Sequence, residues 1–303
     1  MKQTALMDKK LLSKRRTVEI ADKRTHGQMA VFVVAFILLL GYSITLLYPF
    51  VWLFQTSLKT SLEYFTSNSL KWAAIPQWRN YITVFSVLKV KETNFLGMLF
   101  NSLWFTGGTV GLGMFMTSIV SYCLSKYKFG VRNFMYAVII FIMVFPIFAS
   151  GASYKQAQDF GFYDTPFLLV KSMGGYSGMG FLVLYAFYAS LPWDYAEAAL
   201  IDGANDFDVY FKIMLPMAKG PVLSMAIINV ISVWNDYNTP LLYLPSYPTL
   251  ATGLYLYESD ITRAVNYPLY FTGLFISILP ILTLFIFFQD VIMRNVTIGG
   301  LKG

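Results

Sequence analysis

The sequence has one cysteine and one histidine among 303 residues. The single Cys123 excludes an internal disulfide and any metal site built from several cysteines. The single His26 lies in a basic leading segment, far from any predicted intramembrane group, which excludes histidine-based catalysis and metal binding. The chain also lacks a GxxxxGK[ST] phosphate loop. We find no plausible catalytic constellation and predict no enzyme activity.

Charge is also scarce, because charged residues make up 13% of the chain and hydrophobic residues 56%. Soluble domains have about twice that charged fraction. A helix needs roughly 20 uncharged residues to cross a bilayer core. Uncharged windows of this kind predict an all-α membrane protein with six spans, at residues 29–54, 93–125, 133–154, 172–193, 220–257 (with Asp236 as the one exception) and 264–289. Long unbroken apolar runs exclude the alternating ten-residue strands of a membrane barrel.

Basic residues near the span ends predict the orientation. Eight lysines and arginines precede the first window, and Lys126, Lys128 and Arg132 follow the second. Both segments are therefore predicted to be cytoplasmic, and six spans return the C-terminus to the same side. The net charge of +7 needs no nucleic acid, since a basic N-terminus lying against anionic lipid explains it. We predict a multi-pass protein of the cytoplasmic membrane of a bacterium or archaeon, and no cleaved signal peptide.

An acidic segment, residues 192–219, separates the fourth and fifth windows and should face the cytoplasm. Pro192, Asp194 and Glu197 favour the start of a helix, since proline fits the first turn and acids favour its positive end. Asp202-Gly203 predicts a sharp turn. We call residues 192–219 the knob. An ordinary interfacial loop is the alternative, but interfacial helices usually carry a basic polar face.

The second half of the knob predicts another short helix, from about Asp206 to Met214, that ends at Leu215-Pro216. Its apolar stripe would fit a partner's groove or the knob's own packing, and consists of Phe207, Tyr210, Phe211 and Met214. Two short helices joined by a glycine turn indicate a surface that is built to contact another protein.

The knob resembles the EAA loop of binding-protein-dependent ABC transporter permeases. The matching positions are Glu197, Ala198, Ala199, Asp202, Gly203, Ala204, Ile213, Leu215 and Pro216. Ser57-Leu58-Lys59, Asn101-Ser102 and the end Gly299-Gly300-Leu301-Lys302-Gly303 sharpen the resemblance to the maltose-type, MalG-like sugar permeases. The resemblance covers nearly the whole chain, although residues 149–176 have few family features.

This resemblance implies one permease subunit of an ATP-driven carbohydrate importer. The knob would dock as a coupling helix on one of two cytoplasmic ABC ATPase subunits, which bind the ATP and Mg. A second, MalF-like permease, an extracytoplasmic sugar-binding protein and an oligosaccharide substrate complete the implied system. The implied division is a basic N-terminal segment at 1–28, a permease domain at 29–291 and a cytoplasmic tail at 292–303.

The substrate link, residues 234–238, lies in the middle of the fifth window and consists of Trp234, Asn235, Asp236, Tyr237 and Asn238. Aromatic rings stack on sugar rings and amides bond hydroxyl groups, so the resemblance and the chemistry both favour a substrate path. Asp236 would cost about 2.5 to 3.5 kcal/mol on a lipid-facing helix, so it should face the bundle or water. Two alternatives stay open: a carboxylate that only joins helices, and a secondary carrier that uses Asp236 as its coupling-ion site. A carrier usually shows internal repeats, which are not evident here, and leaves the EAA pattern unexplained.

Overall fold

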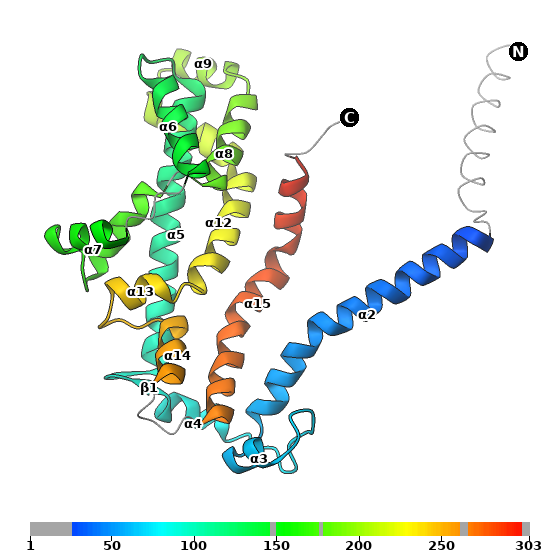
Figure 1. Ribbon diagram of the computed structural model, residues 1–303. Coiled ribbons are helices and arrows are strands. Elements are labelled where there is room, and N and C mark those ends of the chain that lie inside the picture. The colour runs from blue at the N-terminus through cyan, green and yellow to red at the C-terminus, as the bar shows by residue number, and fades with distance from the viewer. Residues whose placement is uncertain (1–25, 146–149, 176–177, 261–265, 299–303) are drawn as a thin grey trace, which may run out of the picture. The chain divides into compact units, whose positions relative to one another are not determined.

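The computed structural model describes residues 26–145, 150–175, 178–260 and 266–298 (Figure 1). The regular secondary structure of these residues is helical apart from one antiparallel hairpin, formed by β1 (Lys89–Val90) and β2 (Thr93–Asn94). The helices are α2 (His26–Ser57), α3 (Ser61–Thr66), α4 (Asn80–Val87), α5 (Phe95–Lys126), α6 (Arg132–Val144), α7 (Ser150–Asp159), the 3₁₀ helix η1 (Pro166–Gly174), α8 (Met179–Ser190), α9 (Asp194–Ile201), α10 (Asp206–Asp208), the π-helix η2 (Val209–Met214), α11 (Leu215–Met217), α12 (Lys219–Trp234), α13 (Asn238–Tyr243), α14 (Leu250–Ser259) and α15 (Tyr267–Ile298). The all-α prediction is confirmed.

The chain divides into two compact units, Met1–Leu53 and Phe54–Gly303. The described part of the first unit is most of α2, whose side chains from Met29 to Val51 are exposed within the chain. The stretch Gly27–Ser57 carries no charge, and an 18-residue window within it has a mean hydropathy of 2.6. A helix of this kind satisfies its own backbone hydrogen bonds, which is the condition for crossing hydrocarbon.

Three helical stretches are long and apolar enough to span a membrane: Gly27–Ser57, Phe95–Lys126 and Tyr267–Asp290. They correspond to the first, second and sixth predicted windows. Two bent pairs raise the count over the described residues to five. Pro166–Gly174 meets Met179–Ser190 at 54°, and Asp206–Met217 meets Lys219–Trp234 at 73°. The helix α6 has only 13 residues, so length and composition alone do not give six spans.

The third, fourth and fifth windows are not single helices, which corrects the sequence prediction. The third window contains α6, which ends at Val144, and the start of α7 at Ser150, and residues 146–149 between them lie outside the described chain. The fourth comprises parts of η1 and α8, and the fifth is divided among α12, α13 and α14. Side chains such as Asn235 and Asp236 offer the backbone local hydrogen bonds that compete with a continuous helix. An uncharged window therefore indicates that the segment lies in a membrane, but it does not indicate that the segment is one continuous helix.

The helix α5 is the axis of the second unit. Near its C-terminal end a buried apolar cluster joins α5 to α8, α9, η2 and α12, and near its N-terminal end another joins it to α4, α14 and α15 (Figure 1). Packing along α5 is close, because a Cβ added to Gly108 would lie 2.4 Å from a methyl group of Leu169. The helix α5 thus connects the knob at one end with the cluster that contains Trp234, the first residue of the substrate link, at the other.

Candidate functional site

The first knob helix, α9, ends in a well-defined capping motif. The amide of Gly203 donates to the carbonyl of Leu200 at 3.1 Å, and the amide of Ala204 donates to the carbonyl of Ala199 at 3.0 Å. These two bonds, with Gly203 at a φ of +87°, form a Schellman motif. The predicted turn at Asp202-Gly203 is confirmed, and its physical reason is the left-handed backbone that glycine adopts without strain.

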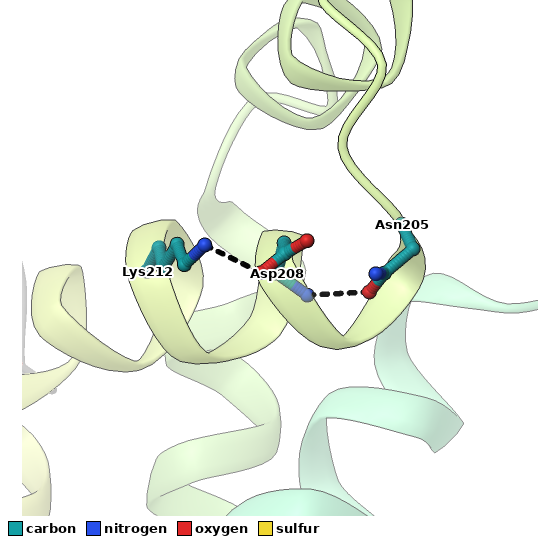
Figure 2. Close-up of polar contacts among 3 residues, drawn as sticks. All are labelled: Asn205, Asp208 and Lys212. Atoms are coloured by element: carbon teal, nitrogen blue, oxygen red, sulfur yellow. Dashed lines mark hydrogen bonds and ion pairs between the residues drawn. The ribbon is translucent and has the colours of Figure 1, made fainter.

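The second half of the knob begins at Asn205, whose Oδ1 accepts from the amide of Asp208 at 2.9 Å (Figure 2). The helical run then continues through α10, η2 and α11 to Met217. The sequence predicts that this helix ends at Leu215-Pro216, and in the structure it extends one residue further. The π-helical stretch ends at Met214, two residues before Pro216, whose ring would clash with the carbonyl four residues earlier in a regular α-helix.

The knob is anchored to the membrane helices through buried hydroxyl groups. The Tyr210 hydroxyl donates to Ser118 Oγ at 2.9 Å, and Ser118 Oγ and the Tyr188 hydroxyl are 2.7 Å apart. These three residues come from η2, α5 and α8 and are at most 5% exposed. At the surface, the Tyr127 hydroxyl donates to Asp206 Oδ1 at 2.7 Å. The knob is therefore a rigid extension of α5 and α8.

The predicted knob residues divide into an outer and an inner set. Glu197, Ala198, Asp202, Gly203 and Pro216 are exposed, whereas Ala199, Ala204, Ile213 and Leu215 are half-buried. The aromatic and apolar stripe divides in the same way, because Tyr210 and Met214 are buried while Phe207 is 77% exposed. The stripe thus serves both the knob's own packing and its surface. The structure adds Ile201 to the exposed set, which the sequence does not single out; it lies beside Asp202 at the end of α9 and is 85% exposed.

An apolar hollow of about 490 Å³ lies beside the second knob helix. Phe207 and Phe211 line it from the knob, and Phe115, Ile119 and Phe129 line it from α5 and the loop after α5. The rings of Phe115 and Phe211 stack with their centroids 6.2 Å apart. The knob therefore offers an acidic exposed helix and, next to it, an apolar recess.

Asp208 in the knob and Tyr127 next to the knob have shifted pKa values. The Lys212 ammonium, 2.7 Å from Asp208 Oδ1, holds the pKa of that carboxyl below its ordinary value (Figure 2). Desolvation and the hydrogen bonds with Tyr122 and Asp206 raise the pKa of the Tyr127 hydroxyl well above its ordinary value. Asp208 is therefore ionised at neutral pH, and Tyr127 keeps the proton that it donates to Asp206.

The substrate link lies at a break between helices and not in the middle of one. The helix α12 ends at Trp234, and α13 begins at Asn238. Asp236 Oδ1 accepts from the amides of Asn238 and Thr239 at 3.0 and 2.9 Å. The carboxylate thus caps the first turn of α13, a local role that the sequence did not indicate.

The five link residues are not equally accessible. Trp234 is 6% exposed, and its indole nitrogen donates to the carbonyl of Ser277 on α15 at 3.1 Å. Its ring therefore joins α12 to α15 and offers no free face. Asn235, Tyr237 and Asn238 are exposed, and Asp236 is half-buried.

A family model described as "Binding-protein-dependent transport system inner membrane component" matches residues 109–298, which is more than half of the chain. The chain belongs to this family. The resemblance that the knob carries is thereby confirmed at the level of the family.

Individual relatives and a solved structure agree with this family. The diacetylchitobiose uptake system permease protein NgcG of Streptomyces coelicolor is 28% identical over 271 residues, which cover 88% of this chain and 87% of the relative. A putative ABC transporter permease, ORF2, of a Caldicellulosiruptor species is 30% identical over 84% of this chain and 91% of its own length. A chain in the crystal structure of a bacterial ABC transporter that imports alginate has a TM-score of 0.75 at 19% identity, and the match covers 88% of this chain and 98% of that chain. This last likeness shows a shared fold.

In this inner membrane component, Tyr255 contacts the substrate link, although the sequence did not predict it as a site residue. The Tyr255 ring on α14 stacks on Tyr237 with centroids 4.7 Å apart and planes 28° apart, and both rings are at least 40% exposed. Thr252, one turn earlier, donates its hydroxyl to the carbonyl of Tyr237 at 2.9 Å. No sequence signal pairs Tyr237 with Tyr255, because their contact depends on the break at Asp236. Among the described residues of this family member, no group of three His, Cys, Asp or Glu could hold a metal ion.

Proposed function

We propose that this chain is one of two permease subunits of an ATP-driven importer and that its substrate is a carbohydrate, most simply an oligosaccharide. The family description and the names of the relatives, which include uptake systems for diacetylchitobiose and arabinooligosaccharides, support this function. The observation that carries the proposal is the knob, an exposed acidic turn closed by Gly203 and bonded into the core through Tyr210.

The proposed arrangement has six spans, with both termini and the knob in the cytoplasm. Three long helices supply three spans, and the bent pair of η1 and α8 would supply a fourth. The helix α12 would supply a fifth and α6 a sixth, while Asp206–Met217, the bent partner of α12, belongs to the knob. The basic segment 1–25 and the tail 299–303 lie outside the described residues, so their cytoplasmic placement rests on the basic residues near the spans. The boundaries at 28/29 and 291/292 likewise stay predictions.

In the proposed mechanism the knob docks on one of two ATPase subunits, which bind ATP and Mg. Glu197 offers an exposed carboxylate to a basic group, and Ala198 allows close approach of the partner backbone. ATPase closure would push on the knob, and the chain of hydroxyl groups from Tyr210 through Ser118 to Tyr188 would carry that displacement to α5 and α8. The membrane helices would then tilt as a rigid body between inward-open and outward-open states.

In the proposed substrate path, the stacked rings of Tyr237 and Tyr255 offer an aromatic surface to a sugar ring. Asn235 and Asn238 offer exposed amides to its hydroxyl groups. A second, MalF-like permease would supply the other half of the path. An extracytoplasmic sugar-binding protein would deliver the substrate.

The secondary-carrier hypothesis has no observation in its favour. Two backbone amides bond Asp236 Oδ1, so the contacts of this carboxylate give it the role of a helix cap. The family match also favours a chain that acts with a separate ATPase. The secondary carrier is therefore kept only as one possible outcome of the purification and uptake experiment described next.

The experiment isolates the chain from native membranes in mild detergent, identifies the copurifying proteins and measures ATP hydrolysis and sugar uptake after reconstitution. We expect an ATPase and a second polytopic chain, with uptake that requires ATP. Glu197→Lys should abolish uptake and release the ATPase, whereas Glu92→Lys, an exposed acid between β1 and β2, should change neither. Recovery of the chain alone, with ATP-independent uptake, would contradict the proposal.

A further inference from the structure

Residues 243–250 run from the last residue of α13 through the connecting loop to the first residue of α14. Side chains from several distant parts of the chain hold this segment. We call it the strap. Near its C-terminal end, Asn101 Nδ2 donates to the carbonyl of Pro248 at 3.0 Å, and Ser102 Oγ accepts from the amide of Leu250 at 2.7 Å. Both of these side chains are buried near the N-terminal end of α5. This end of the strap is therefore fixed to the bundle core.

The other end of the strap is held by Asp164, in the loop between α7 and η1. The amide of Asp164 donates to the carbonyl of Tyr243 at 2.7 Å. Its carboxylate accepts from Ser246 twice, from the amide to Oδ1 at 2.8 Å and from the hydroxyl to Oδ2 at 2.6 Å. One residue thus makes three hydrogen bonds to a four-residue stretch that lies about 80 positions away in the sequence.

Backbone strain supports a specific role for this contact. Among the described residues other than glycine, two have a positive φ, Lys91 and Asp164, both at 53°. Both contact the same stretch of the strap, because Lys91 Nζ donates to the carbonyl of Pro245 at 2.9 Å. Strained backbone of this kind persists where the surrounding structure fixes it, commonly at functional positions.

The helix α13 connects the strap to the substrate link. It is bonded from the link into the strap, since the amide of Leu241 donates to Tyr237 and that of Leu244 donates to Pro240. Asp236 caps its first turn, and the Lys171 ammonium lies 4.1 Å from the ring centroid of Tyr243 at its last residue. A short helix bonded at both ends transmits a displacement of one end to the other.

From this arrangement we infer that Asp164 is a positioning residue for transport: it fixes the C-terminal end of α13 and thereby sets where the link residues Tyr237 and Asn238 present themselves to the substrate. The inference rests on the proposed function for the identity of the substrate. The mechanical part, from Asp164 through α13 to the link, rests on the contacts alone.

The test uses the whole reconstituted complex and three variants. Asp164→Ala removes both carboxylate bonds and strains the left-handed backbone, whereas Asp164→Asn keeps an acceptor and is a residue that tolerates positive φ. Glu63→Ala is the matched control, because the Glu63 carboxylate also accepts a loop amide, that of Ala74 at 2.7 Å, in the connection after α2 and away from the strap. The readouts are the KM and maximal rate of sugar uptake and the hydrogen exchange of residues 235–250.

We expect Asp164→Ala to raise KM roughly five- to tenfold, about the net effect of losing one ordinary hydrogen bond, with a smaller change in maximal rate. Hydrogen exchange should increase at Asn238 and Thr239 as well as at Ser246. Asp164→Asn should restore most of the wild-type KM and most of the protection from exchange. Glu63→Ala should leave KM and this exchange unchanged. An unchanged KM, or exchange that increases only within the strap, would overturn the inference. If the wild-type complex transports no carbohydrate, the proposed function fails, but the exchange data still decide whether Asp164 positions the link.

Discussion

The knob and the substrate link have the same local design but differ in how far the sequence reveals it. Each consists of short helical segments separated by a break and capped by a side chain, Asn205 in the knob and Asp236 in the link. In the knob a glycine marks the break, and the sequence predicts it correctly. In the link no glycine is present, and the sequence predicts a continuous helix that the structure does not contain.

The two regions also differ in how they are fixed. The knob is bonded to α5 and α8 through three buried hydroxyl groups. In the link, Trp234 is buried and bonded to α15, whereas the more accessible residues after it are held by a bond from α14 and by the cap at Asp236. A region that must transmit force is expected to be rigid, and a region that contacts a variable substrate is expected to be adjustable. The comparison therefore predicts large effects of substitutions in the knob and smaller, substrate-dependent effects in the link.

The largest effect should come from Gly203. Valine at a φ of +87° forces a β-branched residue into a conformation that costs roughly 1–2 kcal/mol or more and opens the Schellman motif. We expect Gly203→Val to abolish uptake while the chain still inserts in the membrane, and Gly203→Asn to retain most activity because asparagine tolerates this backbone. Uptake and membrane abundance are measured together. Equal activity of the two variants would mean that the turn geometry is irrelevant to coupling.

The next effect concerns the anchoring of the knob. Ser118→Ala removes a buried partner of both Tyr210 and Tyr188, and an unsatisfied buried polar group costs about 1–3 kcal/mol. We expect a lower unfolding temperature of the complex and ATP hydrolysis that no longer follows uptake. The control is Ser190→Ala, since Ser190 on α8 is exposed and bonds only the carbonyl of Phe187. If Ser118→Ala destabilises the complex but keeps hydrolysis and uptake in proportion, the hydroxyl groups are structural and do not transmit force.

The sequence could predict the all-α fold class, the three long helices and the turn of the knob, because each depends on local signals. Pro192, the acids after it and Gly203 act within a few residues of their own positions. The sequence could not predict the burial of Trp234, the cap formed by Asp236 or the pairing of Tyr237 with Tyr255. The burial and the pairing depend on where another helix lies, α15 for Trp234 and α14 for Tyr255, and the cap depends on the break between α12 and α13.

A smaller effect is expected at Asp236, and it separates the cap from an ion site. Asp236→Ala removes a helix cap, which typically costs about 1 kcal/mol, and should loosen α13 and raise the KM for sugar. Asp236→Asn keeps an oxygen acceptor for the amides of Asn238 and Thr239 and should change uptake only modestly, with ATP still required. A secondary carrier predicts a different pattern, namely that both variants abolish transport alike.

The smallest effect is expected for the exposed pair of Asp208 and Lys212. Lys212 is 74% exposed, so salt and water screen its attraction for the carboxylate. Because the pKa of Asp208 is lowered in the folded state, the pair's stabilisation is complete at neutral pH. It declines as the pH falls through the ordinary value of 3.8 and is lost below the folded-state pKa. We therefore expect Lys212→Met to lower the unfolding temperature slightly at pH 7 and low salt, and not at all at high salt or at a pH below the folded-state pKa of Asp208. A difference that persisted under those conditions would mean that Lys212 stabilises the knob through its apolar stem and not through its charge. The electrostatic part of the comparison would then be wrong, whereas the part that rests on Gly203 and Tyr210 would stand.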